Sequence, residues 1–206
     1  MINYLLKHPD KLIEALVGHI EIVLITLLIS IALASLLAIL SVYSRIISKA
    51  LIGIFAMIYS IPSLALFAIL VPITGLGRVT AIIVLVLYNQ YLLLRNIIDG
   101  LNNIEPAIIE AATGMGMSKS QVLFQIRLPL AAKTIFAGIH LAVVSTIGIA
   151  TIAASINAGG IGKVLLDGLR TVNTAKILWG TLMSAGLAII VNGVLNAVEK
   201  KLGKAF

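Results

Sequence analysis

The residues best placed to do chemistry in this sequence form a polar, glycine-punctuated stretch at residues 99–130, between long apolar segments. Its centre reads Glu110-Ala111-Ala112, with Gly116 following, and it ends at Ile126-x-Leu128-Pro129. Small side chains leave a bare surface that a partner can approach closely, and the methionines beside them offer adaptable apolar contact. The predicted chemistry is noncovalent docking of a partner rather than simple solvation of a loop. The predicted docking residues are Glu110, Ala111, Ala112, Gly114, Met115, Gly116 and Met117.

Local signals predict a helix, a tight turn and a second helix within this stretch. Pro106 suits the first turn of a helix over residues 106–113, because its missing N–H is not needed there. The two glycines that follow can take positive φ and end that helix. Ser118 and Gln121 match a capping box, so a second helix is expected to start there. We expect both helices to lie along the inner membrane face, with Pro129 opening the next apolar segment.

The composition is that of a chain dissolved in lipid. Hydrophobic residues make up 60% of the 206 residues, charged residues only 11%, and the mean hydropathy is +1.13. Soluble domains carry nearer a quarter charged residues. The net charge of +7 is then expected beside anionic headgroups rather than on nucleic acid. The absence of cysteine excludes disulfides, thiolate metal sites and cysteine nucleophiles.

Five apolar stretches are long enough to cross a membrane, since a helix of about 20 residues spans the hydrocarbon. The sequence therefore predicts an all-α integral membrane protein with one domain over residues 1–206. We expect the 99–130 stretch to be a cytoplasmic loop and residues 156–175 to form a re-entrant or outer gate segment. The predicted spans are residues 22–42, 50–73, 77–98, 131–155 and 176–198.

Lysine and arginine positions predict the orientation of these spans. Nine of them fall on the face that carries the 99–130 stretch, and six fall on the other face. Positive residues favour the cytoplasmic side. The N-terminus is therefore expected outside and the C-terminus inside.

Irregular backbone at two places suggests a translocation path. The proline at position 62 either kinks the second span or also frees backbone carbonyls toward a pathway. The uncharged run at residues 134–162 is about nine residues longer than a crossing needs. Its glycine-rich end is either an outer gate or an ordinary loop, and we favour the gate. The candidates at these places are Ser60, Pro62, Ser63, Asn157, Gly159 and Gly160.

Polar side chains within the spans are the remaining candidates, because such groups are costly in lipid and often functional. Tyr88, Asn89 and Asn192 are candidates for the path. The two amides could instead bond neighbouring helices, which we slightly favour. His140 is expected to be neutral and hydrogen-bonded to a neighbouring helix, and His19 is expected at the outer membrane interface.

The run of residues 110–129 resembles, at full spacing, the "EAA" loop of ABC importer permeases. The resemblance implies a type I importer permease fold, in which this loop forms a coupling helix that docks in a groove on a cytoplasmic ATP-binding subunit. ATP and Mg would bind that subunit, so no cofactor or metal is expected in this chain. The other implied partners are an extracellular or lipid-anchored substrate-binding protein, a second permease copy or paralogue, and the lipid of a bacterial cytoplasmic membrane.

Further stretches resemble the glycine betaine/carnitine/choline permease group of that family. They are Ile61-Pro62-Ser63-Leu64-Ala65-Leu66, Gly75-Leu76-Gly77, Leu94-Arg95-Asn96, Gly114-Met115-Gly116-Met117 and Ala158-Gly159-Gly160-Ile161-Gly162. The resemblance implies import of quaternary amine osmoprotectants by alternating access. A permease for another small solute, of the methionine type, is the alternative.

No enzymatic activity is predicted. The sequence has no Gly-x-x-x-x-Gly-Lys-Ser/Thr phosphate loop, so this chain is not the ATPase, and it has no His-Glu-x-x-His motif. An ATP-independent transporter or channel is a weaker alternative, because His140 is the one ionisable residue placed for a relay within the spans. A trimethylammonium group is best held by aromatic faces. Aromatic residues are only 5% of the chain and scattered, so the sequence predicts no cage, and selection is expected in the binding protein.

Overall fold

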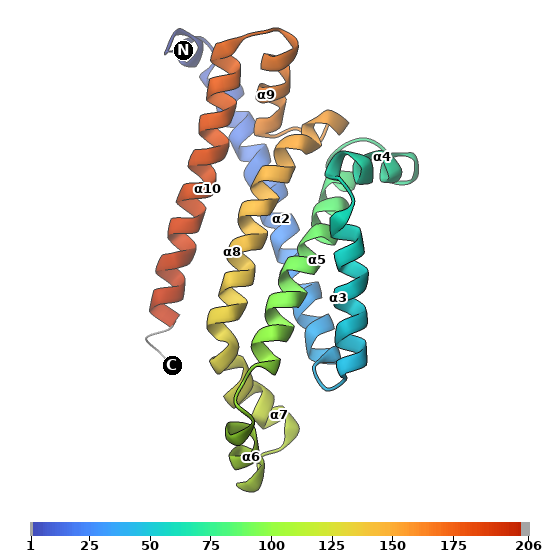
Figure 1. Cartoon of the computed structure of the whole chain (residues 1–206). Helices are drawn as coiled ribbons and strands as arrows, with labels where there is room; N and C mark the ends of the chain where they lie inside the picture. The colour runs from blue at the N-terminus through green and yellow to red at the C-terminus, as the bar shows by residue number, and fades with distance from the viewer. Residues whose placement is uncertain (1, 203–206) are drawn as a thin grey trace.

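The computed structural model describes residues 2–202, and every regular element in that range is helical. Figure 1 shows a bundle of long helices with short helices at both ends. The elements are α1 (Ile2–Lys7), α2 (Pro9–Ser41), α3 (Arg45–Ser60), α4 (Ser63–Thr74), α5 (Arg78–Asn102), α6 (Pro106–Gly114), α7 (Lys119–Gln121), the π-helix η1 (Val122–Arg127), α8 (Leu128–Ile152), the 3-10 helix η2 (Ala153–Ile156), α9 (Ile161–Arg170) and α10 (Thr174–Leu202).

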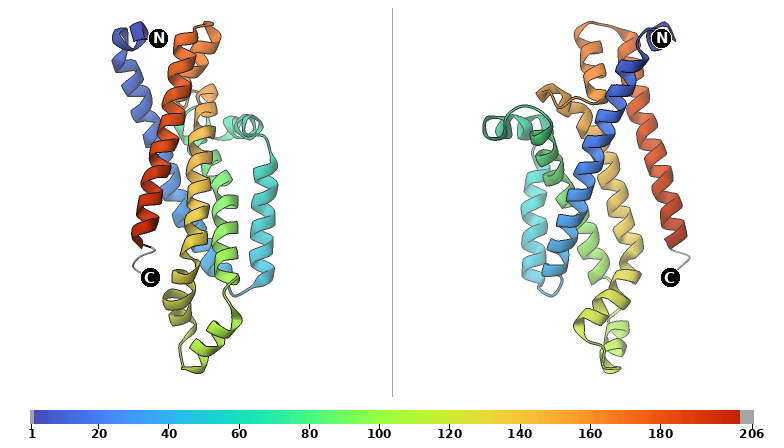
Figure 2. Two further views of the ribbon diagram at one scale, coloured as in Figure 1. Left: turned by 60° about the vertical axis from the view of Figure 1, so that its left-hand side comes forward. Right: turned by 180° about the vertical axis from the view of Figure 1, so that it is seen from behind.

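The long helices alternate in direction, so α1 and the end of α10 lie at opposite ends of the bundle (Figures 1 and 2). Helices α2, α5 and α10 run toward the end that carries α6 and α7, while α3 and α8 run away from it. We call this end the hairpin end and the other, which carries α4 and α9, the far end. This arrangement agrees with an odd number of membrane spans, for which the two ends of the chain lie on opposite sides.

Helix α5 forms the centre of the bundle and packs closely on α2 and α8. Small residues permit the close approach to α8, as in many membrane helix pairs. A Cβ added at Gly138 would lie 2.6 Å from Asn96 Cβ, and one added at Gly100 would lie 3.2 Å from Ala131 Cβ. By contrast, only 6% of the apolar window of α10 is buried. Its outward side chains are therefore suited to lipid or to a neighbouring protein.

Four helices are long and apolar enough to span a membrane, and a fifth span exists if α3 and α4 count as one. That pair differs from the straight or merely kinked helix predicted for residues 50–73. Helix α3 begins earlier, at Arg45, and α4 turns away from it by 97°. Pro62 causes the break, because a residue before proline is driven out of the helical region. Ile61 accordingly adopts φ −71° and ψ 131°.

The second helix predicted at the hairpin end is also different. It begins at the expected capping box but continues without a stop into α8, so residues Lys119–Ile156 form one helical run. Pro129 lies in the first turn of α8, as predicted, but α8 continues the preceding helical run without a break. A proline cannot donate to the carbonyl four residues back and clashes with it. The wider π-helical turn of η1, directly before Pro129, accommodates that defect.

Candidate docking surface and translocation path

The α6–α7 hairpin at the tip of the molecule is fixed by its own backbone hydrogen bonds. Gly116 has φ +85° and donates its N–H to the Thr113 carbonyl at 2.9 Å. Met117 N–H donates to the Ala112 carbonyl at 3.2 Å. The two bonds make a Schellman motif, which satisfies the last carbonyls of α6. The predicted role of Gly116 as a left-handed helix terminator is confirmed.

The predicted capping box is also confirmed. Ser118 Oγ accepts a hydrogen bond from Gln121 N–H at 3.3 Å, and Gln121 Oε1 accepts one from Ser118 N–H at 2.8 Å. Tyr43, in the loop between α2 and α3, donates its hydroxyl to the Lys119 carbonyl at 3.0 Å. The hairpin is thus rigid and connected to the bundle.

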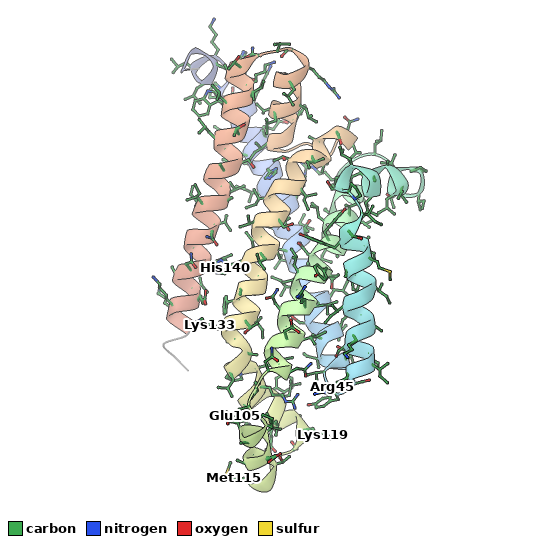
Figure 3. All side chains as sticks on the ribbon, in the orientation of Figure 1. Arg45, Glu105, Met115, Lys119, Lys133 and His140 are labelled. Atoms are coloured by element: carbon green, nitrogen blue, oxygen red, sulfur yellow. The ribbon has the colours of Figure 1, made fainter. Side chains whose placement is uncertain are left out.

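The predicted docking residues lie together on this hairpin, and most of them are exposed. Met115 is 77% exposed and lies at the tip, beyond the ends of the long helices (Figure 3). Ala112 is the exception, since it is 2% exposed and packs inward. The prediction for Gly114 was wrong, because it has no positive φ and is the last helical residue of α6. A Cβ added there would meet no atom within 4 Å. Nothing within this chain therefore requires glycine at position 114.

A groove of about 430 Å³ lies beside the hairpin. Glu110 lines it together with Arg45 and Arg127, and none of the three forms an ion pair among the described residues. Arg127 Nε is buried without a hydrogen-bond partner. The groove thus combines one carboxylate with two guanidinium groups that form no ion pair among the described residues.

The break between α3 and α4 brings four of the predicted path residues together. Ser60 Oγ donates to the Met57 carbonyl at 2.7 Å, and Pro62 and Ser63 form the bend itself. Tyr88, on α5, donates its hydroxyl to the Ile61 carbonyl. The break thus leaves the Ile61 carbonyl outside the helical hydrogen-bond ladder, and the Tyr88 hydroxyl donates to it.

Asn89 lies in a buried polar junction that joins three helices. Its side-chain amide donates to Ser30 Oγ on α2 at 3.3 Å and to Thr146 Oγ1 on α8 at 2.8 Å. Gln90 donates to the Ser30 carbonyl at 3.3 Å. All four residues are at most 1% exposed. In this structure Asn89 bonds neighbouring helices, the reading that sequence reasoning slightly favoured.

The predicted gate residues form a left-handed turn at the far end. Asn157, Gly159 and Gly160 have φ of 62°, 85° and 72°. A Cβ at Gly160 would lie 2.9 Å from His19 Nδ1, so the turn rests directly on α2. A pocket of about 680 Å³, lined by all three residues, opens beside them.

His19 makes contacts that sequence reasoning did not find. It is fully buried within the protein, and its Nε2 lies 3.2 Å from the Ile147 carbonyl oxygen on α8. It therefore connects α2, α8 and the gate turn. The available signal was Gly160, where an added Cβ would collide with His19.

The side chain of Asn192, on α10, is hydrogen-bonded to His140, on α8. His140 Nδ1 lies 2.5 Å from Asn192 Oδ1, and His140 Nε2 lies 3.4 Å from Glu199 Oε2. The predicted bond between His140 and a neighbouring helix is confirmed. This contact joins α8 to α10 toward the hairpin end (Figure 3).

Fold and hairpin together define a class: a helical subunit with four or five candidate membrane spans and an exposed helical hairpin at one end. Among solved structures, two inward-facing forms of the MetNI methionine ABC transporter share the fold, with TM-scores of 0.82 and 0.84. They are 16% and 17% identical over 93% and 95% of this chain, and the alignments cover 95% and 98% of theirs. The type I importer permease fold is thereby confirmed.

The family is the one described as "Binding-protein-dependent transport system inner membrane component", whose pattern matches residues 24–204, and this chain belongs to it. The choline transport permease OpuBB of Bacillus subtilis is 32% identical over 205 residues, covering 100% of this chain and 94% of that protein. OsmW, an osmoprotectant import permease of Salmonella typhimurium, is 31% identical over 96% of this chain and 94% of its own. The carnitine permease OpuCD of Listeria monocytogenes is 40% identical over 131 residues, which are 63% of this chain and 59% of that protein.

Proposed function

We propose that this chain is the membrane-spanning permease subunit of an ATP-driven importer for quaternary amine osmoprotectants such as glycine betaine, carnitine and choline. The named relatives transport choline, carnitine and osmoprotectants, which supports this class of cargo. The observation that carries the proposal is the exposed α6–α7 hairpin, whose turn is fixed by hydrogen bonds and whose surface a partner can contact.

That partner is a cytoplasmic ATP-binding subunit, which supplies ATP and Mg. The hairpin end then faces the cytoplasm, the N-terminus lies outside, and the subunit sits in a bacterial cytoplasmic membrane. Exposed helices such as α3 and α10 would pack on a second permease copy or paralogue as well as on lipid. A binding protein would deliver cargo at the far end, where Asn157, Gly159 and Gly160 line the open pocket.

Substitution of Gly114 tests the docking surface directly. Because a Cβ at Gly114 would meet no atom of this chain within 4 Å and the backbone there is helical, we expect Gly114→Leu to leave the hairpin intact while blocking close approach of a partner. We expect the variant to lose co-purification with the ATP-binding subunit and ATP-driven uptake. The matched control is Gly53→Leu, on α3, where an added Cβ also meets nothing within 4 Å. Normal association and uptake by Gly114→Leu would refute the docking assignment.

The cargo class is tested by competition uptake in the complete complex. Betaine, choline and carnitine are expected to compete, whereas methionine and proline are not. Uptake that no trimethylammonium compound inhibits would overturn the cargo assignment. Flux through the chain reconstituted without the ATP-binding subunit would instead indicate an ATP-independent transporter.

A further inference from the structure

Three of the five tyrosines of the chain come together beside the α3–α4 break. The ring of Tyr59, in the last turn of α3, lies 5.5 Å from that of Tyr88 at an angle of 70°. It lies 5.0 Å from the ring of Tyr91 at 35°. Tyr88 is buried and the other two are half-buried. We call these residues the tyrosine cluster.

The backbone next to the cluster is electronegative. The last carbonyls of a helix carry the negative end of its dipole. At the end of α3 the Ile58 carbonyl accepts from Ile61 N–H at 3.1 Å, and the Ile61 carbonyl accepts from the Tyr88 hydroxyl. Pro62 has no N–H to offer. The C-terminal end of α3 therefore lies beside the cluster, and such half-helix ends also line cation sites in other transporters.

These two features suit a cation that has no N–H group. A trimethylammonium group cannot donate a hydrogen bond, but ring faces attract it electrostatically. We propose that the tyrosine cluster is a transient binding site for the trimethylammonium group of the cargo along the translocation path. The inference rests on the proposed function and adds the residues that meet the cargo inside the permease.

The cluster already holds one cation, on its side toward the hairpin end. The Arg95 guanidinium lies 5.9 Å from the Tyr91 ring centroid, and its Nη1 donates to the Tyr91 hydroxyl at 2.7 Å. Its charge is shared with Asp99, at 3.8 Å. The cargo is therefore assigned to Tyr59 and Tyr88, next to the break. A nearby fixed cation keeps this binding weak, which transport requires because the cargo must also leave.

The test uses the complex of permease and ATP-binding subunit in detergent, without binding protein. The probe is tetramethylammonium, followed by saturation-transfer NMR, and tert-butanol is its neutral counterpart. We expect saturable binding of tetramethylammonium alone. Tyr59→Leu should raise its dissociation constant by roughly tenfold. Tyr59→Phe should keep the affinity, because the ring remains, and Phe136→Leu is the control for loss of an aromatic residue elsewhere.

Unchanged tetramethylammonium affinity in Tyr59→Leu, or equal binding of tert-butanol, would overturn the inference. Loss of binding in both Tyr59→Phe and Tyr59→Leu would also overturn it, because the ring would not be the cause. Uptake assays on the complete system separate this failure from failure of the proposed function. A wild-type system that imports no quaternary amine refutes the cargo class. Normal import by the wild type, together with an unchanged tetramethylammonium affinity in Tyr59→Leu, refutes the cluster alone.

Discussion

Asn89 Nδ2 lies 2.8 Å from Thr146 Oγ1, and this bond joins α5 to α8 in the buried centre of the bundle. Thr146 also donates to the Ala142 carbonyl at 2.6 Å, so its hydroxyl remains bonded to its own helix. The junction holds together the three most closely packed helices, α2, α5 and α8. In lipid, where apolar side chains gain little from leaving the solvent, such interhelix bonds and tight packing carry much of the association.

Removing the Asn89 amide should destabilise the bundle. We expect Asn89→Ala to reduce the free energy of unfolding in detergent by about 1 kcal/mol, because Ser30 and Thr146 lose a partner. Thermal denaturation of the purified permease measures the change. A double-mutant cycle with Thr146→Val should show a smaller loss than the sum of the two single losses. Strict additivity would mean that the two residues do not interact energetically.

The gate turn should not tolerate a side chain at Gly160. Its φ of +72° and the 2.9 Å approach of an added Cβ to His19 Nδ1 both oppose substitution. Gly160→Ala is expected to lower stability by about 1–2 kcal/mol from the left-handed backbone alone. Thermal denaturation and uptake report the effect. Gly148→Ala is the control, since a Cβ at that helical position meets nothing within 4 Å.

The two hairpin glycines should respond in opposite ways to alanine. Gly116→Ala forces a side chain into φ +85° and should cost about 1 kcal/mol. Gly114→Ala lies in a helix with open surroundings and should stabilise it by about 0.5–1 kcal/mol. Thermal denaturation of the isolated permease distinguishes the two. Equal destabilisation by both would contradict the helical ending described for α6.

Asp167 should contribute little to stability despite its ion pair. The Lys176 ammonium, which donates to its carboxylate, lowers the pKa of Asp167. A lowered pKa means that the pair stabilises the fold above the ordinary carboxyl pKa, and that this is lost as pH falls through the lowered value. The pair is exposed, so salt should screen it. Asp167→Asn is expected to shift the melting temperature only slightly, and less at high salt; a large, salt-independent shift would contradict this.

Local rules predicted much of this structure. Proline at the start of α6, glycine at its end and the Ser118–Gln121 box act within a few residues, so the hairpin could be read from the sequence. The length of the apolar stretches indicated which helices are long enough to span a membrane. The same rules did not predict that the helix continues through Pro129, which starts α8 as expected but follows the π-helical turn of η1 without a break.

Contacts between distant segments could not be predicted in this way. Tyr59 and Tyr88 belong to different helices, and only the 97° break sets one beside the other. Scattered aromatics therefore suggested no cage. His19 was expected at the membrane interface because it lies at the outer end of the first span, and its close contact with Gly160, far along the chain, could not be foreseen. Such positions follow from helix packing rather than from spacing.

The uninterrupted helical run Lys119–Ile156 has a mechanical consequence. Its 38 residues extend roughly 57 Å, from the hairpin to the gate turn. A continuous helix transmits a tilt at one end toward the other, and η1 is the one π-helical turn in this run. We therefore expect a displacement of the hairpin at Met115 to rotate α8 about its contact with α5. The gate turn at Asn157 would then move in the opposite direction.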